Sequence, residues 1–198
     1  MTLPDSHAQE EQTLIEAAIH SDMEAFTTLY RRYVSSVYTY ITYRVGNLED
    51  SEELVSQTFM KVVEYLPTFE WRHHLSFKAW LFRLAYTIVC DYYRHKKGRR
   101  HQLEQTVIPL QDLPEIEASD YLPDDILLRK ESFAQLRELI GTLSPAQQEV
   151  ITLHFYAGLR LKEICQVLGL PRGAVDSHLR RGLESLRKKL AGQAFEHA

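Results

Sequence analysis

The clearest structural signal in this chain lies in residues 161–190, LKEICQVLGLPRGAVDSHLRRGLESLRKKL. Ile164 and Leu168 give a short first helix an apolar face, and Cys165 is small enough for a second helix to approach closely. Gly169 supplies the left-handed residue that ends this first helix. The pattern predicts a helix-turn-helix. The alternative is a two-helix hairpin with a charged solvent face.

The second helix of this stretch has an apolar and a polar side. Four apolar residues fall within about 80° of arc at about 100° per residue, and we expect them to face the core: Val175, Leu179, Leu183 and Leu186. We expect the polar residues to face outward: Ser177, Arg180, Arg181, Glu184 and Lys188. A helix with Arg and Ser along one side can enter a major groove, with residues near its start at base edges and later residues at phosphates.

Charge is arranged in blocks along the 198 residues, although the net charge is only −4. Residues 71–101 carry +7 and residues 151–190 carry +5, whereas residues 102–131 between them carry −6. Basic blocks suit polyanion binding, and an acidic stretch between them can keep a weak binder off random nucleic acid. Each block alone is also typical of a solvated helix face. The motifs must therefore decide between a polyanion-binding surface and an ordinary solvated one.

The rest of the chain mostly has the 3.6-residue apolar period of helices. We expect helices over residues 21–46, 50–66, 76–97, 130–141, 145–157, 161–168 and 172–190. Residues 102–126 lose the period, contain three prolines and are acidic, which predicts a flexible linker. The sequence therefore predicts an all-α protein of two small helical domains joined by an acidic flexible linker, with the helix-turn-helix in the second.

Several classes of protein are disfavoured. Cys90 and Cys165 have neither disulfide-framework nor zinc spacing, and adjacent His73 and His74 lack a third ligand, so we expect no metal site. No apolar run reaches the roughly 18 residues of a membrane span and the start lacks basic residues, so we expect a cytoplasmic protein without membrane insertion. The absence of P-loop, HExxH and GxSxG patterns predicts no enzyme, no catalytic residue and no cofactor.

The helix expected over residues 76–97 interleaves aromatic and basic residues. If Leu81, Leu84, Ala85 and Ile88 pack inward, another face holds Trp80, Arg83, Thr87 and Arg94 and leads into a basic run that includes Lys97. Single-stranded DNA is bound in this way, because bases stack on aromatic rings while cations follow the phosphates. The alternative is that the aromatic residues fill the core of a small helical domain.

The helix expected over residues 50–66 also has two sides. We expect one side to point inward: Leu54, Thr58, Val62 and Tyr65. The other side is acidic with a Met at its centre: Glu53, Ser56, Gln57, Met60 and Glu64. Such a surface suits a basic protein partner that also offers an apolar contact.

Three stretches together resemble an extracytoplasmic-function (ECF) sigma factor of the sigma-70 family. They are residues 21–69, SDMEAFTTLYRRYVSSVYTYITYRVGNLEDSEELVSQTFMKVVEYLPTF; residues 76–100, SFKAWLFRLAYTIVCDYYRHKKGRR; and residues 143–190, LSPAQQEVITLHFYAGLRLKEICQVLGLPRGAVDSHLRRGLESLRKKL. The resemblance assigns region 2 to residues 21–100 and region 4 to residues 131–191. Residues 1–20 are left as an N-terminal tail and residues 101–130 as the linker.

The resemblance implies a dissociable initiation subunit of bacterial RNA polymerase with no catalytic activity. Its implied partners are the polymerase core and promoter DNA, and an anti-sigma factor can be a further partner. In this interpretation, polymerase holds the two domains at a spacing that selects paired promoter elements. The alternative is a stand-alone helix-turn-helix regulator whose first helices sense or dimerise, and which binds duplex DNA without polymerase.

The resemblance also assigns roles by position. Polymerase binding falls on Asp50, Glu53, Gln57 and Met60. Minus-10 recognition and melting fall on Trp71, Arg72, His74, Trp80, Arg83, Thr87, Arg94 and Lys97. In this interpretation the polar segment 70–75 captures a flipped base. Minus-35 recognition falls on Arg172, Ser177, His178, Arg180, Arg181 and Lys188. The chain departs from the family at Thr87, usually Asn, at Asp176, commonly Lys, and at His178, commonly Arg, so the promoter sequence does not carry over from relatives.

Overall fold

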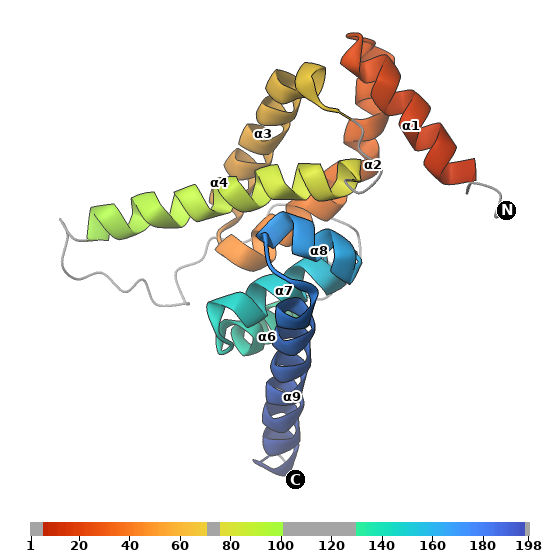
Figure 1. Cartoon of the computed structure of the whole chain (residues 1–198). Helices are drawn as coiled ribbons and strands as arrows, with labels where there is room; N and C mark the ends of the chain where they lie inside the picture. Colours follow the sequence, from red (N-terminus) through yellow and green to blue (C-terminus); the bar gives the residue numbers. More distant parts are fainter. Residues whose placement is uncertain (1–5, 71–75, 101–129, 197–198) are drawn as a thin grey trace, which may run out of the picture.

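A computed structural model of the chain describes residues 6–70, 76–100 and 130–196. Within these ranges there are eight α-helices, one short 3₁₀ helix and no strand (Figure 1). The prediction of an all-α protein is confirmed. No helix in the described part of the chain is both long and apolar enough to cross a membrane.

The first half of the chain contains α1 (Ser6–Ile19), α2 (Met23–Val45), α3 (Leu48–Tyr65), the 3₁₀ helix η1 (Leu66–Thr68) and α4 (Phe77–Arg100). Helices α2, α3 and α4 pack on one another, and α1 packs on α2 and η1. Residues 6–19, which belong to the expected N-terminal tail, pack on the first half of the chain as α1. They form a helix because Ile15 and Ala18 have an apolar surface to pack against, and both are buried.

The starts of α2 and α3 are fixed by side-chain caps. The Asp22 carboxylate accepts hydrogen bonds from two backbone N–H groups of the first turn of α2, at 2.9 and 3.0 Å. The Asn47 side chain accepts one from the backbone N–H of Asp50 at 2.9 Å. These bonds satisfy donors that a helix start otherwise leaves unpaired. Both helices begin within a few residues of the predicted positions.

The second half contains α6 (Lys130–Gly141), α7 (Pro145–Phe155), α8 (Leu161–Leu168) and α9 (Arg172–Glu196). Helices α8 and α9 form the predicted helix-turn-helix. Gly169 ends α8 with a φ of 65°, a left-handed conformation that glycine adopts without a Cβ clash. Cys165 packs against the core beneath this turn.

The buried side of α9 differs from the prediction at one residue. Leu183 was expected inside, but it is 40% exposed, and Gly182 is buried in its place. A Cβ on Gly182 would lie 2.6 Å from the Cδ1 atom of Ile151, so α7 approaches α9 at this glycine. The inward side of α9 therefore passes from the buried Val175 through the buried Gly182 to the half-buried Leu186.

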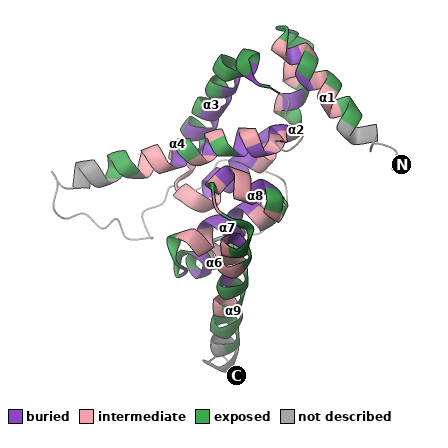
Figure 2. Ribbon diagram, in the orientation of Figure 1, coloured by how far each residue is buried: buried purple, intermediate pink, exposed green. Residues whose placement is uncertain are grey.

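The two halves of the chain pack directly on each other. Helix α7 lies against α2, and α8 lies against α4 (Figure 1). One cluster of buried apolar residues contains Tyr40 and Phe82 from the first half and Val150 and Ile164 from the second. In Figure 2 the buried residues gather where these helices meet. The predicted linker lies outside the described residues, apart from Lys130, which begins α6.

Candidate nucleic-acid and protein interfaces

The outer side of α9 carries the residues predicted to contact duplex DNA. Arg172, Arg180, Arg181 and Lys188 are exposed, and Ser177 and His178 are half-buried. Helix α9 extends away from the rest of the molecule, so much of its length is accessible (Figure 1). An exposed helix with cations along one side has the shape and charge needed to enter a major groove.

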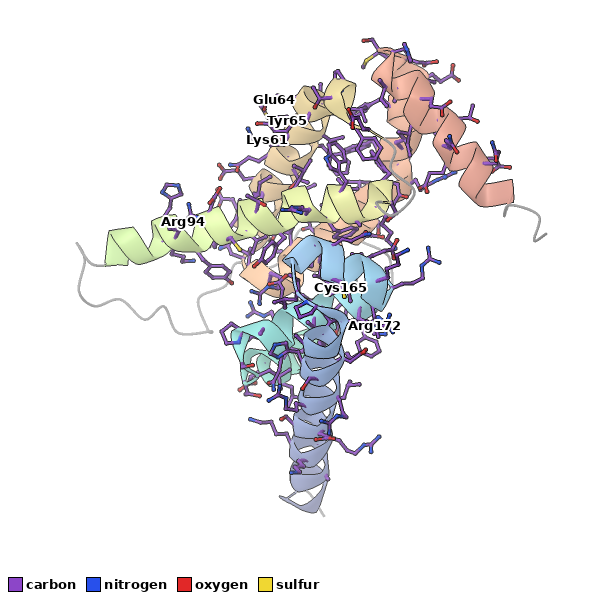
Figure 3. All side chains as sticks on the ribbon, viewed as in Figure 1. Lys61, Glu64, Tyr65, Arg94, Cys165 and Arg172 are labelled. Carbon is purple, nitrogen blue, oxygen red and sulfur yellow. The ribbon has the colours of Figure 1, made fainter. Side chains whose placement is uncertain are left out.

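Three arginines of α9 are held in two different ways. The Nε atom of Arg172, in the first turn of α9 (Figure 3), donates to both carboxylate oxygens of Asp176 at 3.2 and 3.3 Å. The Nε atom of Arg181 donates to the backbone carbonyl of Ser177 at 3.3 Å. Both contacts leave the terminal nitrogens for other acceptors. Arg180 instead uses a terminal nitrogen, Nη1, to contact Glu184 at 3.3 Å.

The outer face of α4 combines cations with one accessible ring. Arg83, Thr87 and Arg94 are exposed, whereas Trp80 is half-buried against Phe69, with ring centroids 4.9 Å apart. Other aromatic residues of α4, Phe77 and Phe82, are fully buried, as the alternative interpretation of this helix expected. Trp80 is therefore both a packing residue and a partly exposed ring. Trp71, Arg72, His74 and the side chain of Lys97 lie outside the described residues.

The outer face of α3 is exposed as predicted over most of its length. Glu53, Ser56, Gln57, Met60 and Glu64 are all exposed, and Met60 reaches 69%. Tyr65 was expected to point inward, but it is 40% exposed, because the chain turns into η1 and Leu66 takes the buried position. Lys61 pairs with Glu64 at 3.0 Å and lies over the Tyr65 ring, and Figure 3 shows these three side chains together on α3.

Two clefts flank this face of α3. The cleft between α3 and α4 has a volume of about 580 Å³, and Glu53, Gln57 and Lys96 contribute polar groups to its lining. The cleft between α2 and α3 has a volume of about 430 Å³, and its lining is mostly apolar: Phe26, Tyr30, Val55, Phe59, Met60 and Val63. The exposed side of α3 is thus a ridge with a polar cleft on one side and an apolar cleft on the other.

Asp50 has a structural partner that the sequence did not indicate. The Tyr92 hydroxyl donates to the Asp50 carboxylate at 2.7 Å, and Lys96 donates to the Tyr92 hydroxyl at 2.7 Å. Burial, and next the hydrogen bond to Asp50, raise the pKa of Tyr92, so this hydroxyl keeps its proton. Asp50 therefore joins α3 to α4 and is less available to a partner than Glu53.

The sequence analysis missed one pair of charged residues. Arg44 of α2 and Glu149 of α7 form an ion pair of 3.0 Å between the two halves of the chain, and both side chains are largely buried. Burial raises the pKa of Glu149, although the neighbouring Arg44 guanidinium opposes that change. A carboxylate on the buried side of an otherwise apolar helix was the one available signal, and it does not identify the partner.

The two cysteines are both free, and the described residues contain no group of three or more His, Cys, Asp or Glu side chains placed to hold a metal ion.

Two family models match this chain. The model described as Sigma-70 region 2 matches residues 29–99, and the model described as Sigma-70, region 4 matches residues 133–186. The ECF RNA polymerase sigma factor BldN of Streptomyces coelicolor is 35% identical over 190 residues, which cover 96% of this chain and 69% of that protein. The ECF RNA polymerase sigma factor SigW of Bacillus subtilis is 28% identical over 172 residues, 85% of this chain and 90% of that protein.

Two solved structures share the fold. CnrH, solved in complex with the cytosolic domain of CnrY, has a TM-score of 0.69 and 21% identity, and the match covers 92% of this chain and 97% of that chain. The sigma factor RpoE from Bartonella quintana, solved with the anti-sigma factor NepR, has a TM-score of 0.64 and 19% identity, with 85% and 98% covered. At these identities the two likenesses concern the fold alone.

Proposed function

Because the chain belongs to the ECF sigma factors of the sigma-70 family, we propose that three separate surfaces on α3, α4 and α9 divide the work of promoter recognition. The chain is an alternative sigma factor that acts with RNA polymerase, and the stand-alone regulator is not favoured. We infer that it supplies binding surfaces and no catalytic group, and that it works in the cytoplasm with the polymerase. An anti-sigma factor is a further proposed partner, since CnrH and RpoE were each solved in a complex and NepR is an anti-sigma factor.

Helix α9 selects the minus-35 element. Arg172 and Arg181 are the proposed guanine contacts, because each is held through Nε and can present two terminal nitrogens to the O6 and N7 atoms of guanine. Ser177 and His178 lie between them and contact neighbouring base edges. Arg180 and Lys188 are exposed further along the helix and contact phosphates.

The outer face of α4, with the segment 71–75 before it, binds the separated strand at the minus-10 element. Arg83 is exposed, and the partly exposed Trp80 ring offers a stacking surface. Thr87 and Arg94 extend this face along the helix, and the basic run that contains Lys97 follows them in the sequence. Trp71, Arg72 and His74 complete the proposed surface by accepting a flipped base, whose lost stacking is offset by these contacts.

The ridge of α3 binds the polymerase core. Glu53 and Gln57 border the polar cleft, and Met60 borders the apolar one. This combination fits a basic partner helix that also inserts an apolar side chain. Asp50, which is hydrogen-bonded to Tyr92, contributes by fixing the start of α3.

The observation that carries the proposal is that three exposed surfaces of different chemistry lie on three helices of a chain that matches both sigma-70 regions. The test is a titration with purified core polymerase, followed by run-off transcription from a promoter library. We expect core binding and core-dependent transcripts. DNA binding that is specific without core, and no run-off with it, would reject the proposal.

A double variant tests the polymerase surface separately. Glu53→Lys with Met60→Ala reverses the charge of the ridge and removes its apolar group, and both residues are exposed, so the fold should not suffer. We expect core affinity to fall by about tenfold or more, since a reversed charge meets the partner with repulsion. The exposed Glu138→Gln on α6 is the control. Unchanged affinity of the double variant would remove this ridge from the interface.

A further inference from the structure

The cleft between α2 and α3, which we call the apolar cleft, has the size and walls of a ligand site. Its volume of about 430 Å³ falls within the range of roughly 300–1,000 Å³ that small-molecule sites occupy. The rings of Tyr30 and Phe59 form an aromatic wall, with centroids 4.6 Å apart in a T-shaped arrangement. Met60 is a further lining residue, 69% exposed, and its flexible side chain can adapt to the shape of a ligand. An aromatic ring is the apolar group that these walls suit best.

A polar group lies at the buried end of the apolar cleft. Tyr38 is the most deeply buried residue of the lining, at 1% exposure. Its hydroxyl is buried and makes no hydrogen bond of normal geometry with any residue in the described part of the chain. The same holds for the hydroxyl of Thr42, one turn further along α2. A buried hydroxyl without a partner costs stability, so a ligand that forms a hydrogen bond here would remove that cost.

The charge of the apolar cleft has one sign. Among its described lining residues Glu52 is the only charged one, and it is exposed. Burial, and next the negative charge of Glu52, raise the pKa of Tyr38, so the hydroxyl stays protonated and lies within the field of this carboxylate. An ammonium group at this end can donate to the Tyr38 oxygen and is attracted by Glu52, whereas a carboxylate would be repelled.

The cleft between α3 and α4 differs in both respects. Its lining carries acidic and basic side chains that can neutralise one another: Asp50, Glu53 and Asp91, with Lys61, His95 and Lys96. The tyrosine of this cleft, Tyr92, has its hydroxyl bonded to both Asp50 and Lys96. Of the two clefts, the apolar one therefore has the unpaired hydroxyl and the single sign of charge that select a ligand.

We propose that the apolar cleft binds a small aromatic amine. The ring of such a ligand lies against Tyr30 and Phe59, and its ammonium group donates to the Tyr38 hydroxyl and faces Glu52. The cleft also borders the ridge of α3, because Met60 belongs both to its lining and to the proposed polymerase surface. The bound amine therefore competes with the polymerase core, and this second part rests on the proposed function.

Tryptamine serves as the probe in a titration of the full chain by isothermal titration calorimetry. 3-Ethylindole and indole-3-propionate carry the same ring with a neutral and a negative end. We expect tryptamine to bind about threefold to tenfold more tightly than 3-ethylindole, and indole-3-propionate to bind most weakly, because only the charge and hydrogen bonding of the end group differ. Equal affinities of the three compounds, or no binding of tryptamine, would overturn the proposal.

Methionine methyl signals locate the bound probe. The chain has three methionines, of which Met60 lines the cleft, whereas Met23 is exposed and lies outside the lining. In a chain labelled with ¹³C-methyl methionine, tryptamine should shift the Met60 signal and leave the Met23 signal unchanged. Met60→Leu identifies the Met60 signal. A shift of the Met23 signal without one of Met60 would place the probe elsewhere and contradict the proposed site.

Two tyrosine variants test the polar end of the cleft. Tyr38→Phe keeps the ring and removes the hydroxyl, so tryptamine affinity should fall by about threefold to tenfold while 3-ethylindole affinity stays the same. Because this hydroxyl has no partner among the described residues, the melting temperature of Tyr38→Phe should equal or exceed that of wild type.

Tyr92→Phe is the matched control for Tyr38→Phe. It should lower the melting temperature, since the Tyr92 hydroxyl is bonded to Asp50, and it should leave tryptamine affinity unchanged. A loss of stability in Tyr38→Phe with unchanged tryptamine affinity would show that the Tyr38 hydroxyl is structural, and it would overturn the proposal.

A charge variant tests the role of Glu52. Glu52→Gln removes the negative charge and keeps the shape, so the difference in affinity between tryptamine and indole-3-propionate should shrink by about threefold. Glu138→Gln on α6 removes an exposed charge outside the cleft and should preserve this difference. Equal effects of the two substitutions would overturn the contact between the ammonium group and Glu52.

Competition with the polymerase core is measured in the presence of the probe. With tryptamine at about ten times its dissociation constant, the apparent dissociation constant for core should rise by about tenfold for wild type. The rise should be smaller for Tyr38→Phe at the same tryptamine concentration. Unchanged core affinity of the tryptamine-saturated chain would overturn the competition. A wild type that fails to bind core without tryptamine would reject the proposed function instead, because the titrations of the chain alone decide the ligand site.

Discussion

Helices α4 and α9 each present a row of basic residues to solvent, but Arg83 on α4 and the arginines of α9 have different surroundings. On α4 the partly exposed ring of Trp80, which packs on Phe69, lies three residues before Arg83, and further along the helix Arg94 pairs with Asp91 at 3.0 Å. On α9 the partners of Arg172 and Arg180 are the carboxylates of Asp176 and Glu184. A ring beside a cation suits an unstacked base, whereas a carboxylate beside an arginine fixes the direction of a guanidinium. Positive charge alone therefore does not define the task of a nucleic-acid-binding helix.

The largest expected effect concerns Arg181. Arg181→Ala should remove about 1–3 kcal/mol of discrimination at one or two positions of the minus-35 element, because a bidentate contact to guanine is lost. Selection of binding sites from a randomised upstream element measures this preference. A loss of affinity that is uniform over all sequences would make Arg181 a phosphate contact and assign specificity to its neighbours.

The second effect concerns strand opening by α4. Arg83→Ala should lower the yield of open complex by about tenfold while closed-complex formation is retained, because the separated strand loses a cation beside its stacked bases. His74→Ala tests the segment before α4 in the same way. Permanganate footprinting detects the unpaired thymines. Normal opening in both variants would exclude this face from melting. Trp80→Ala is a poorer test, since it also removes packing against Phe69.

A smaller effect separates the two arginine–carboxylate pairs of α9. Asp176→Ala should reduce guanine preference at the position contacted by Arg172 by about threefold, since an exposed ion pair contributes only a few tenths of a kcal/mol to 1 kcal/mol. Glu184→Ala is the matched control, with the same four-residue spacing and a similar distance. It should leave base preference unchanged, because Arg180 is paired through a terminal nitrogen. Equal effects of the two substitutions would show that Asp176 does not position Arg172.

The smallest effect concerns Lys188, which lies on α9 beyond the turns that we propose to contact bases. Lys188→Ala should weaken binding to all sequences alike and reduce the slope of log affinity against log salt by about one. Fluorescence anisotropy over a range of salt concentrations measures this slope. A change in base preference with an unchanged slope would contradict a phosphate contact.

The predictability of this fold differs between local and long-range features. Gly169 and the apolar spacing around it predicted α8 and α9, because a left-handed helix end and a helix face are local properties. The sequence analysis placed Leu183 and Tyr65 on the buried side of their helices, because the apolar period takes account only of hydropathy and spacing. The space beside Ile151 and the turn into η1 decided these positions instead.

Local sequence patterns could not predict how the two halves of the chain pack on each other. An apolar surface such as that of Phe82 and Ile164 has the same sequence signature whichever partner covers it. Arg44 and Glu149 lie on different helices far apart in the chain, and nothing near either residue identifies the other. The exposed faces of α3, α4 and α9 were more accessible to prediction, since an exposed face requires no knowledge of a partner inside the chain.

The difference between α4 and α9 can be tested most directly with two promoter templates, one fully paired and one with a pre-opened, mismatched minus-10 region. Run-off transcription with core polymerase is compared for wild type, Arg83→Ala and Arg181→Ala. If α4 opens the strands and α9 selects the duplex, the pre-opened template restores transcription by Arg83→Ala to about the wild-type level and leaves Arg181→Ala defective. Rescue of both variants, or of neither, would contradict this division of work.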